Sequence, residues 1–208
     1  MASIKRALIA LASLLVLASA QAAPITYTFT ANVRGELLAL DDTPTDFAGF
    51  MTVVITGDTA DVSDAKFGAG IPAIDANLTN TFKINSTVGP DVDSSITDGG
   101  LYVFNNQGGE VVGFGNASNS DLLDLGPDAA LAAYDLATSF GPLLDATPFF
   151  GQFDKVQLAN GLRVTLGDAF DATFTAVTAA TRVPEPGSIA LLGAALAGIG
   201  LARRRRRA

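Results

Sequence analysis

The sequence predicts an all-β fold, an antiparallel β-sandwich of jelly-roll or immunoglobulin-like type, over residues 23–182. Several short segments alternate apolar and polar residues, which is the pattern of strands that bury one face. Gly, Asp and Asn separate these segments, as turns do in a sandwich. The region is also long enough to bury the core of one domain. A β-barrel is the main alternative fold.

The most regular strand is expected at the start of this domain. Over residues 25–33, apolar side chains occupy every second position, and Thr or Asn occupies the others. Residues 47–56 and 78–84 predict two further strands. Gly49 marks an expected β-bulge in the first of these two, because glycine inside a strand often accompanies a bulge. Three strands are therefore predicted in the first half of the domain.

The second half is less regular. Residues 105–109 predict a hairpin connection, and Asn160 with Gly161 forms a tight-turn signal. Residues 127–140 fit either a short helix or a strand, and we favour a strand over residues 132–136. The other strands predicted here cover residues 101–104, 110–114, 149–153, 156–158, 162–166 and 170–177.

Charge limits the partners of the domain. The 208-residue chain has 21 acidic and 13 basic residues and a formal net charge of -8. Only one acidic residue lies outside residues 23–182, whereas seven of the basic residues do, so the domain itself carries about -14. Such a charge excludes nucleic acid and anionic membrane surfaces as expected partners, and it attracts cations.

Missing residue types exclude several kinds of site. The chain has no cysteine, histidine or tryptophan. No disulfide can therefore stabilise the domain. A Ser-His-Asp triad, a Cys-His pair and a typical zinc site are excluded for the same reason.

Three aspartates form the candidate metal site of the sequence. Asp58, Asp61 and Asp64 recur at every third residue in a segment without strand alternation. Carboxylate oxygens on loops are ligands that calcium prefers, so calcium is the candidate cofactor, although the EF-hand pattern is absent. The alternative is that these are solvated turn carboxylates, because Asp favours turns for local backbone reasons.

The N-terminal segment predicts a cleavable signal peptide over residues 1–22. Lys5 and Arg6 form a basic region, and residues 7–18 form an apolar stretch of signal-peptide length. Small residues then place the cleavage site after Ala20 or Ala22, and we favour Ala22. An uncleaved anchor is the alternative, but it requires a longer apolar run.

The C-terminal segment, residues 183–208, combines three unlike elements. Val183, Pro184, Glu185 and Pro186 form an extended strip, because proline fixes φ and lacks a backbone donor. Residues 187–202 carry no charge and as a helix would span roughly 24 Å, which is short for a bilayer core of about 30 Å. The chain then carries a run of arginines: Arg203, Arg204, Arg205, Arg206 and Arg207.

These elements predict a transmembrane helix followed by a topological stop. Arginine side chains can extend to the membrane surface, which makes a short span workable. Clustered arginines favour the cytoplasmic side, so the domain is expected on the periplasmic side. The alternative is a buried core helix followed by a disordered basic end.

This tail resembles the PEP-CTERM sorting signal, on its Pro184-Glu185-Pro186 triplet, apolar helix and terminal arginines. The resemblance implies export, a transient inner-membrane intermediate and processing by an exosortase near the triplet. It also implies association with exopolysaccharide and biofilm at the cell surface or in the extracellular matrix. It implies no activity for the mature domain.

Three functions are compatible with this sequence. The first is a noncatalytic surface or matrix protein. The second is a carbohydrate-binding module, for which Tyr27, Tyr102 and Tyr134 are the tyrosines on which a sugar could stack. The third is a glycoside hydrolase, which needs two carboxylates facing each other in one cleft. We expect no catalysis, because no pair of acidic residues stands out in the sequence.

Overall fold

The computed structural model describes residues 22–97 and 99–179, and Ala22–Ala179 forms one compact unit. No helix within these residues is long and apolar enough to cross a bilayer. Four predicted features lie outside the described residues. They are the signal peptide up to residue 21, the sorting strip at residues 183–186, the membrane helix at 187–202 and the arginine run at 203–207.

The regular elements of the described chain are eleven strands (β) and two short 3-10 helices (η). They are β1 (Pro24–Leu38), β2 (Pro44–Asp58), η1 (Thr59–Asp61), β3 (Ala73–Ile74), β4 (Thr79–Val88), β5 (Val92–Ser94), β6 (Tyr102–Asn106), β7 (Val111–Asn116), β8 (Ser120–Leu125), η2 (Ala129–Ala133), β9 (Phe140–Asp145), β10 (Val156–Gln157) and β11 (Arg163–Thr178).

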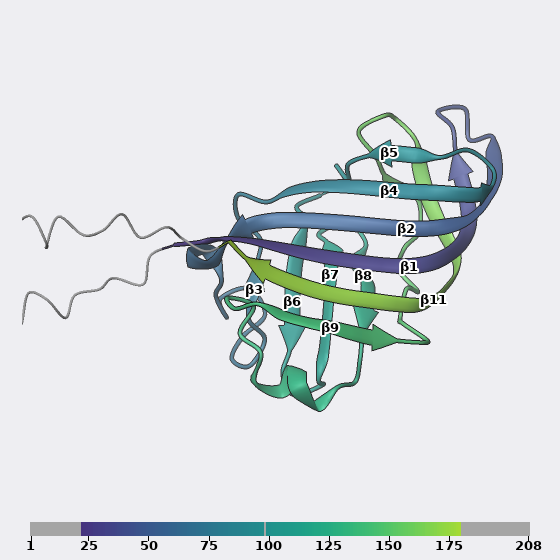
Figure 1. Ribbon diagram of the computed structural model, residues 1–208. Helices are drawn as coiled ribbons and strands as arrows, with labels where there is room; N and C mark the ends of the chain where they lie inside the picture. Colours follow the sequence, from purple (N-terminus) through teal and green to yellow (C-terminus); the bar gives the residue numbers. More distant parts are fainter. Residues whose placement is uncertain (1–21, 98, 180–208) are drawn as a thin grey trace, which may run out of the picture. The chain divides into compact units, whose positions relative to one another are not determined.

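The strands form two antiparallel sheets. The larger sheet has the order β10-β11-β1-β2-β4-β5, with β9 also paired to β11, and the smaller sheet has the order β3-β6-β7-β8. Figure 1 shows the long strands of the larger sheet in front of β3, β6, β7 and β8. The predicted all-β antiparallel fold is confirmed, whereas its jelly-roll or immunoglobulin-like type stays a prediction.

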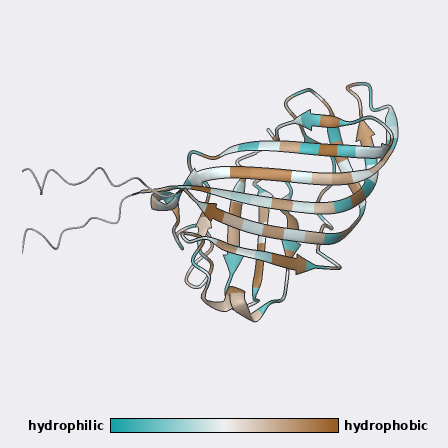
Figure 2. Ribbon diagram, viewed as in Figure 1, coloured by the Kyte–Doolittle hydropathy of each residue, from teal (hydrophilic) through white to brown (hydrophobic). Residues whose placement is uncertain are grey.

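The two sheets bury one hydrophobic core. Figure 2 shows apolar and polar residues interspersed along the strands of the larger sheet, and in β1 buried residues alternate with partly exposed ones, as the sequence predicts. The ring of Phe29 in β1 lies 4.9 Å from Phe114 in β7 and 4.9 Å from Phe174 in β11, measured between centroids. Phe29 therefore contacts an aromatic ring of its own sheet and one of the facing sheet.

A bulge lies at Gly49, but its extra residue belongs to β4 and not to the strand in which the sequence predicted it, β2. In the pairing of β2 with β4, Ala48 lies opposite Val88 and Gly49 lies opposite Ser86, so Thr87 has no partner of its own in β2. A Cβ on Gly49 would lie 2.4 Å from the backbone oxygen of Asn85. Glycine is required at this position because the two backbones approach so closely.

The two strands predicted at 162–166 and 170–177 are one strand, β11. This part of the prediction was wrong because Gly167 and Asp168 are typical turn residues. Opposite β1, the pairing shifts register twice, between Thr30 and Asn32 and between Arg34 and Gly35. At each shift β11 contains one residue more than β1. The strand therefore continues through two bulges where the sequence suggests a turn.

The strands predicted at 149–153 and 132–136 are absent. Near the first position only Phe149 makes a β-bridge, to Asp124, and the Phe153 N–H then donates to the Phe150 carbonyl at 2.9 Å, which closes a turn. At the second position the chain forms η2, because the Asp128 carboxylate accepts from the Ala130 N–H at 2.8 Å and caps it.

Side chains from both sheets form hydrogen bonds with η2 and the loop that follows it. The Tyr27 hydroxyl of β1 donates to the Leu136 carbonyl at 2.6 Å. From β6, the Asn105 amide nitrogen donates to the carbonyls of Leu131 and Tyr134 at 2.8 and 2.7 Å. Asn105 is fully buried, so these backbone oxygens have no water to replace its amide.

Replacing Asn105 with leucine is expected to lower the free energy of unfolding by about 1–3 kcal/mol, because it removes the two buried hydrogen bonds that its amide donates to the carbonyls of Leu131 and Tyr134. Urea unfolding followed by circular dichroism measures this change. The matched control is Gln107→Leu, which removes only a second donor, at 3.0 Å, to the Tyr134 carbonyl. A loss no larger than that of the control would contradict the assigned role of Asn105.

Candidate functional site

The three candidate calcium ligands are not brought together. The Asp58 carboxylate accepts from the Ala60 N–H at 2.9 Å and caps η1, and the Asp61 carboxylate accepts from the Asn77 amide at 3.1 Å. Asp64 lies at a turn, where its backbone oxygen accepts from the Gly68 N–H at 2.8 Å. Within residues 22–97 and 99–179, no group of three or more acidic side chains is placed to hold a metal ion. The positions of Asp58 and Asp61 fit the turn-carboxylate alternative.

A different pair of carboxylates lies on the outer face of the smaller sheet. In β8, Asp121 pairs with Gly115, Leu123 with Phe114 and Asp124 with Gly113, so the register shifts by one residue at Leu122. Residues three apart in a regular strand point to opposite faces. The bulge places Asp121 and Asp124 on the same face, while Leu122 and Leu123 are both buried.

Two glycines of β7 make room for side chains on this face. A Cβ on Gly115 would lie 2.5 Å from the Tyr102 hydroxyl, and one on Gly113 would lie 2.2 Å from Asp124 Oδ1. Tyr102 of β6 therefore reaches across the central strand, where its hydroxyl donates to Asp121 Oδ1 at 2.9 Å. The outer face of β6 and the outer face of β8 meet above these glycines.

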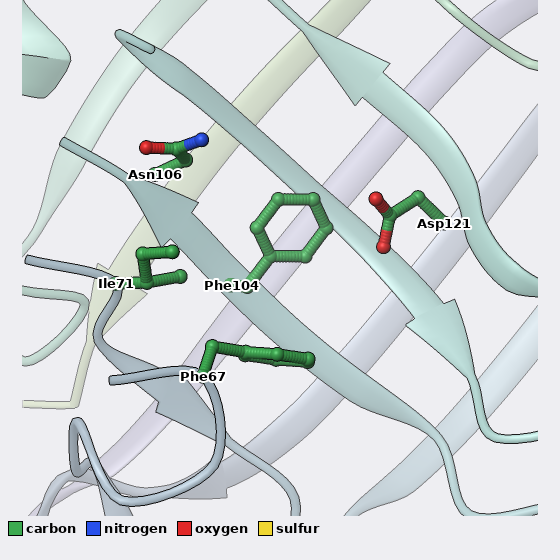
Figure 3. Close-up of a pocket in the computed structure, with 5 residues that line it drawn as sticks. All are labelled: Phe67, Ile71, Phe104, Asn106 and Asp121. Atoms are coloured by element: carbon green, nitrogen blue, oxygen red, sulfur yellow. The ribbon is translucent and has the colours of Figure 1, made fainter. Parts of the chain in front are cut away.

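A loop before β3 completes the site with an aromatic wall. The Phe67 ring lies 5.1 Å from Tyr102 and 6.1 Å from Phe104, measured between centroids. Phe67 is 40% exposed, unlike the two rings of β6. Figure 3 shows Phe67 and Ile71 on one side of Phe104, with Asp121 on the other side, on β8 and beyond the central strand β7.

These side chains surround a small open pocket of about 130 Å³. Its lining consists of Phe67, Ile71, Phe104, Asn106 and Asp121. We call this set, together with Tyr102 and Asp124 beside it, the outer-face pocket. It offers two aromatic rings, one amide and one carboxylate to a ligand, and a second carboxylate lies next to it.

The carboxylate of Asp124 lies in an environment that disfavours its charged form. Burial, and then the negative charge of Asp121, raises the pKa of Asp124 to about 7. Asp124 Oδ1 is buried and accepts no hydrogen bond from the described residues. Burial together with the hydrogen bond to Asp121 also raises the pKa of Tyr102, so its hydroxyl stays a neutral donor at physiological pH.

One cation already lies against the aromatic wall. The Lys66 ammonium is 4.6 Å from the centroid of the Tyr102 ring and 5.7 Å from that of Phe67. It also forms an ion pair with Asp75 at 3.0 Å. Its charge is therefore balanced by Asp75 rather than by the two carboxylates of the pocket.

Most of this site was missed by the sequence analysis. Of the three tyrosines considered for sugar stacking, Tyr27 and Tyr134 lie in the core, and Tyr102 lies at the pocket but is itself buried. The available signal was Gly113 and Gly115, which share one face of β7. Glycines at alternate positions of a strand mark a face where other groups approach the backbone closely.

Comparison with known proteins concerns the tail alone. A family model described as PEP-CTERM protein-sorting motif matches residues 182–207. No curated protein and no solved structure matches the chain.

Proposed function

We propose that this chain, which carries a PEP-CTERM protein-sorting motif at residues 182–207, is a noncatalytic protein of the cell surface or extracellular matrix. The motif is the observation that carries the proposal, since it marks an exported, membrane-transiting protein that exosortase processes. In this proposal the domain passes through an inner-membrane intermediate on the periplasmic side. It then joins the exopolysaccharide of a biofilm as a β-sandwich module.

The proposal that the domain is noncatalytic rests on the positions of its acidic residues. Asp121 and Asp124 are two carboxylates on the same face of β8, which makes them a pair to test against the requirements of a glycoside hydrolase. Within the outer-face pocket, Asp121 lines the cavity itself, whereas Asp124 lies beside the cavity with its Oδ1 buried. A glycosidic bond in the pocket would meet one carboxylate, whereas hydrolysis needs an acid and a second carboxylate at the same bond.

Carbohydrate binding is the second candidate function, and the outer-face pocket favours it. Partly exposed Phe67 offers a ring face, and Asp121 and Asn106 offer polar groups next to it. An aromatic face with a few polar groups in a small concave site is the usual composition of small-ligand sites. The pocket would make the domain an adhesive module within a matrix.

The sorting strip and the arginine run are proposed to have different roles in the tail. In the proposed route, Pro184, Glu185 and Pro186 are recognised and processed, while the run from Arg203 to Arg207 holds the chain in the membrane until cleavage. Proline favours an extended backbone, which supports the proposal that an enzyme recognises this strip.

Replacing Glu185 with alanine is expected to abolish processing, because it removes the only charge between the two prolines. The intact mass of the protein recovered from its native host measures this. Wild type should begin near Ala23 and end near the triplet, with or without an added mass. The variant should keep its arginine tail.

The matched control is Glu36→Ala, which removes an exposed glutamate of β1 and should be processed like wild type. A Glu185→Ala protein that is processed normally would overturn the assigned role of this residue. A wild-type protein that keeps its arginine tail would overturn the sorting route itself.

A further inference from the structure

The outer-face pocket holds negative charge that the protein does not balance. The described residues contain three ion pairs, Lys66–Asp75, Lys83–Asp93 and Arg163–Asp42, and none of them involves Asp121 or Asp124. Asp121 accepts a hydrogen bond from the Tyr102 hydroxyl, whereas Asp124 Oδ1 accepts none from the described part of the chain. A bound cation would supply the missing positive charge.

The walls of the pocket also favour a cation. The faces of aromatic rings carry partial negative charge and attract ammonium groups that lie within about 6 Å of the centroid. Lys66 shows that this wall accepts such a group, because its ammonium lies 4.6 Å from the centroid of Tyr102. The rings of Phe67 and Phe104 line the pocket, and Lys66 is not among its lining residues.

The composition of the pocket favours an organic cation over a metal ion. Calcium takes six to eight oxygen ligands, and magnesium needs a nearly ideal octahedron of them. Here Asp121 and Asn106 are the polar lining residues, and the others are Phe67, Ile71 and Phe104. A cavity of about 130 Å³ fits a ring-sized group whose apolar face can lie against Phe67.

We propose that the outer-face pocket binds an ammonium group carried on a sugar ring, that is, an amino-sugar residue with a free amine. The ammonium donates to Asp121 and the ring lies against Phe67. The side-chain oxygen of Asn106 accepts from the Gly109 N–H at 3.0 Å, which leaves its amide nitrogen to donate to a ring hydroxyl. The choice of a polysaccharide as the carrier rests on the proposed matrix function.

Binding is tested by isothermal titration calorimetry on the full chain in mild detergent, so the result does not depend on processing. The probes are a glucosamine trisaccharide, its fully N-acetylated form, a neutral glucose trisaccharide and tetramethylammonium. We expect the glucosamine trisaccharide and tetramethylammonium to bind. The N-acetylated and neutral trisaccharides should bind at least about tenfold more weakly, because neither offers a charge to Asp121.

Two variants assign the binding to the pocket. Asp121→Asn keeps an acceptor for Tyr102 and should weaken glucosamine-trisaccharide binding about tenfold or more. Phe67→Ala removes a partly exposed ring and should weaken it about threefold. The control is Asp168→Asn, which removes an exposed charge of the larger sheet and should bind like wild type. Circular dichroism confirms that each variant is folded.

Equal binding of the glucosamine and N-acetylated trisaccharides would overturn the proposal, as would unchanged binding by folded Asp121→Asn. Binding of tetramethylammonium without the glucosamine trisaccharide would overturn the amino sugar as the carrier. A chain that binds the trisaccharide as expected but keeps its arginine tail in the host would support the pocket and overturn the sorting route.

Discussion

Replacing Phe29 with alanine is expected to lower the free energy of unfolding by about 3–5 kcal/mol. Phe29 is completely buried, and its ring lies 4.9 Å from Phe114 of the facing sheet and from Phe174 of the neighbouring strand. The substitution loses the apolar transfer energy of the ring and leaves a cavity between the sheets. No disulfide is present to compensate, since the chain has no cysteine.

The matched control for this substitution is Thr28→Ala. Thr28 is the preceding residue of β1, and it points to the other face of the sheet, where it is partly exposed. Replacing Thr28 with alanine is expected to change the free energy of unfolding by less than about 1 kcal/mol. Urea unfolding followed by circular dichroism measures both variants. Similar losses for the two would mean that Phe29 does not join the sheets.

Replacing Asp124 with asparagine is expected to remove a pH-dependent loss of stability. The pKa of Asp124 is raised from 3.8 to about 7 in the folded protein, so between these values the folded chain binds a proton that the unfolded chain has released. The stabilisation from this proton is complete below pH 3.8 and is lost as the pH rises through about 7. The full loss is at most about 4 kcal/mol.

The measurement is the free energy of urea unfolding at several pH values from 4 to 8, for wild type and Asp124→Asn. Other carboxylates titrate in this window as well, so the quantity of interest is the difference between the two curves. The Asp124→Asn variant should become progressively more stable than wild type as the pH rises. The exposed-charge control Asp168→Asn should follow wild type in shape, and curves for Asp124→Asn that stay parallel to wild type would contradict the prediction.

Local patterns determined three long strands of the larger sheet, β1, β2 and β4, and the sorting motif of the tail. The alternation over residues 25–33 identified β1, because a strand with one buried face needs an apolar residue at every second position. Asn160 and Gly161 identified the turn before β11, where Gly161 has a φ of 86°. The sorting motif at 182–207 was readable because its elements are adjacent in sequence.

The candidate site could not be read in this way, because its residues come from separate segments. Phe67 precedes β3, Tyr102 and Phe104 lie in β6, and the two carboxylates lie in β8. Only the pairing of β6, β7 and β8 brings them together above Gly113 and Gly115. Sequence spacing reports local geometry, such as the hairpin between β6 and β7, but it does not place the loop of Phe67 or the side chains of β8 beside β6.

Tertiary pairing also overrode local signals at two positions. The bulge at Leu122 turns Asp121 and Asp124 to one face, although a regular strand would separate them. Gly167 and Asp168 suggest a turn, but the long pairing with β1 keeps β11 continuous through them. The sequence by itself determined the strands β1, β2 and β4 of the larger sheet and the presence of the sorting motif. The tertiary structure decided which polar residues meet, because long-range pairing and buried contacts outweigh the preferences of single residues.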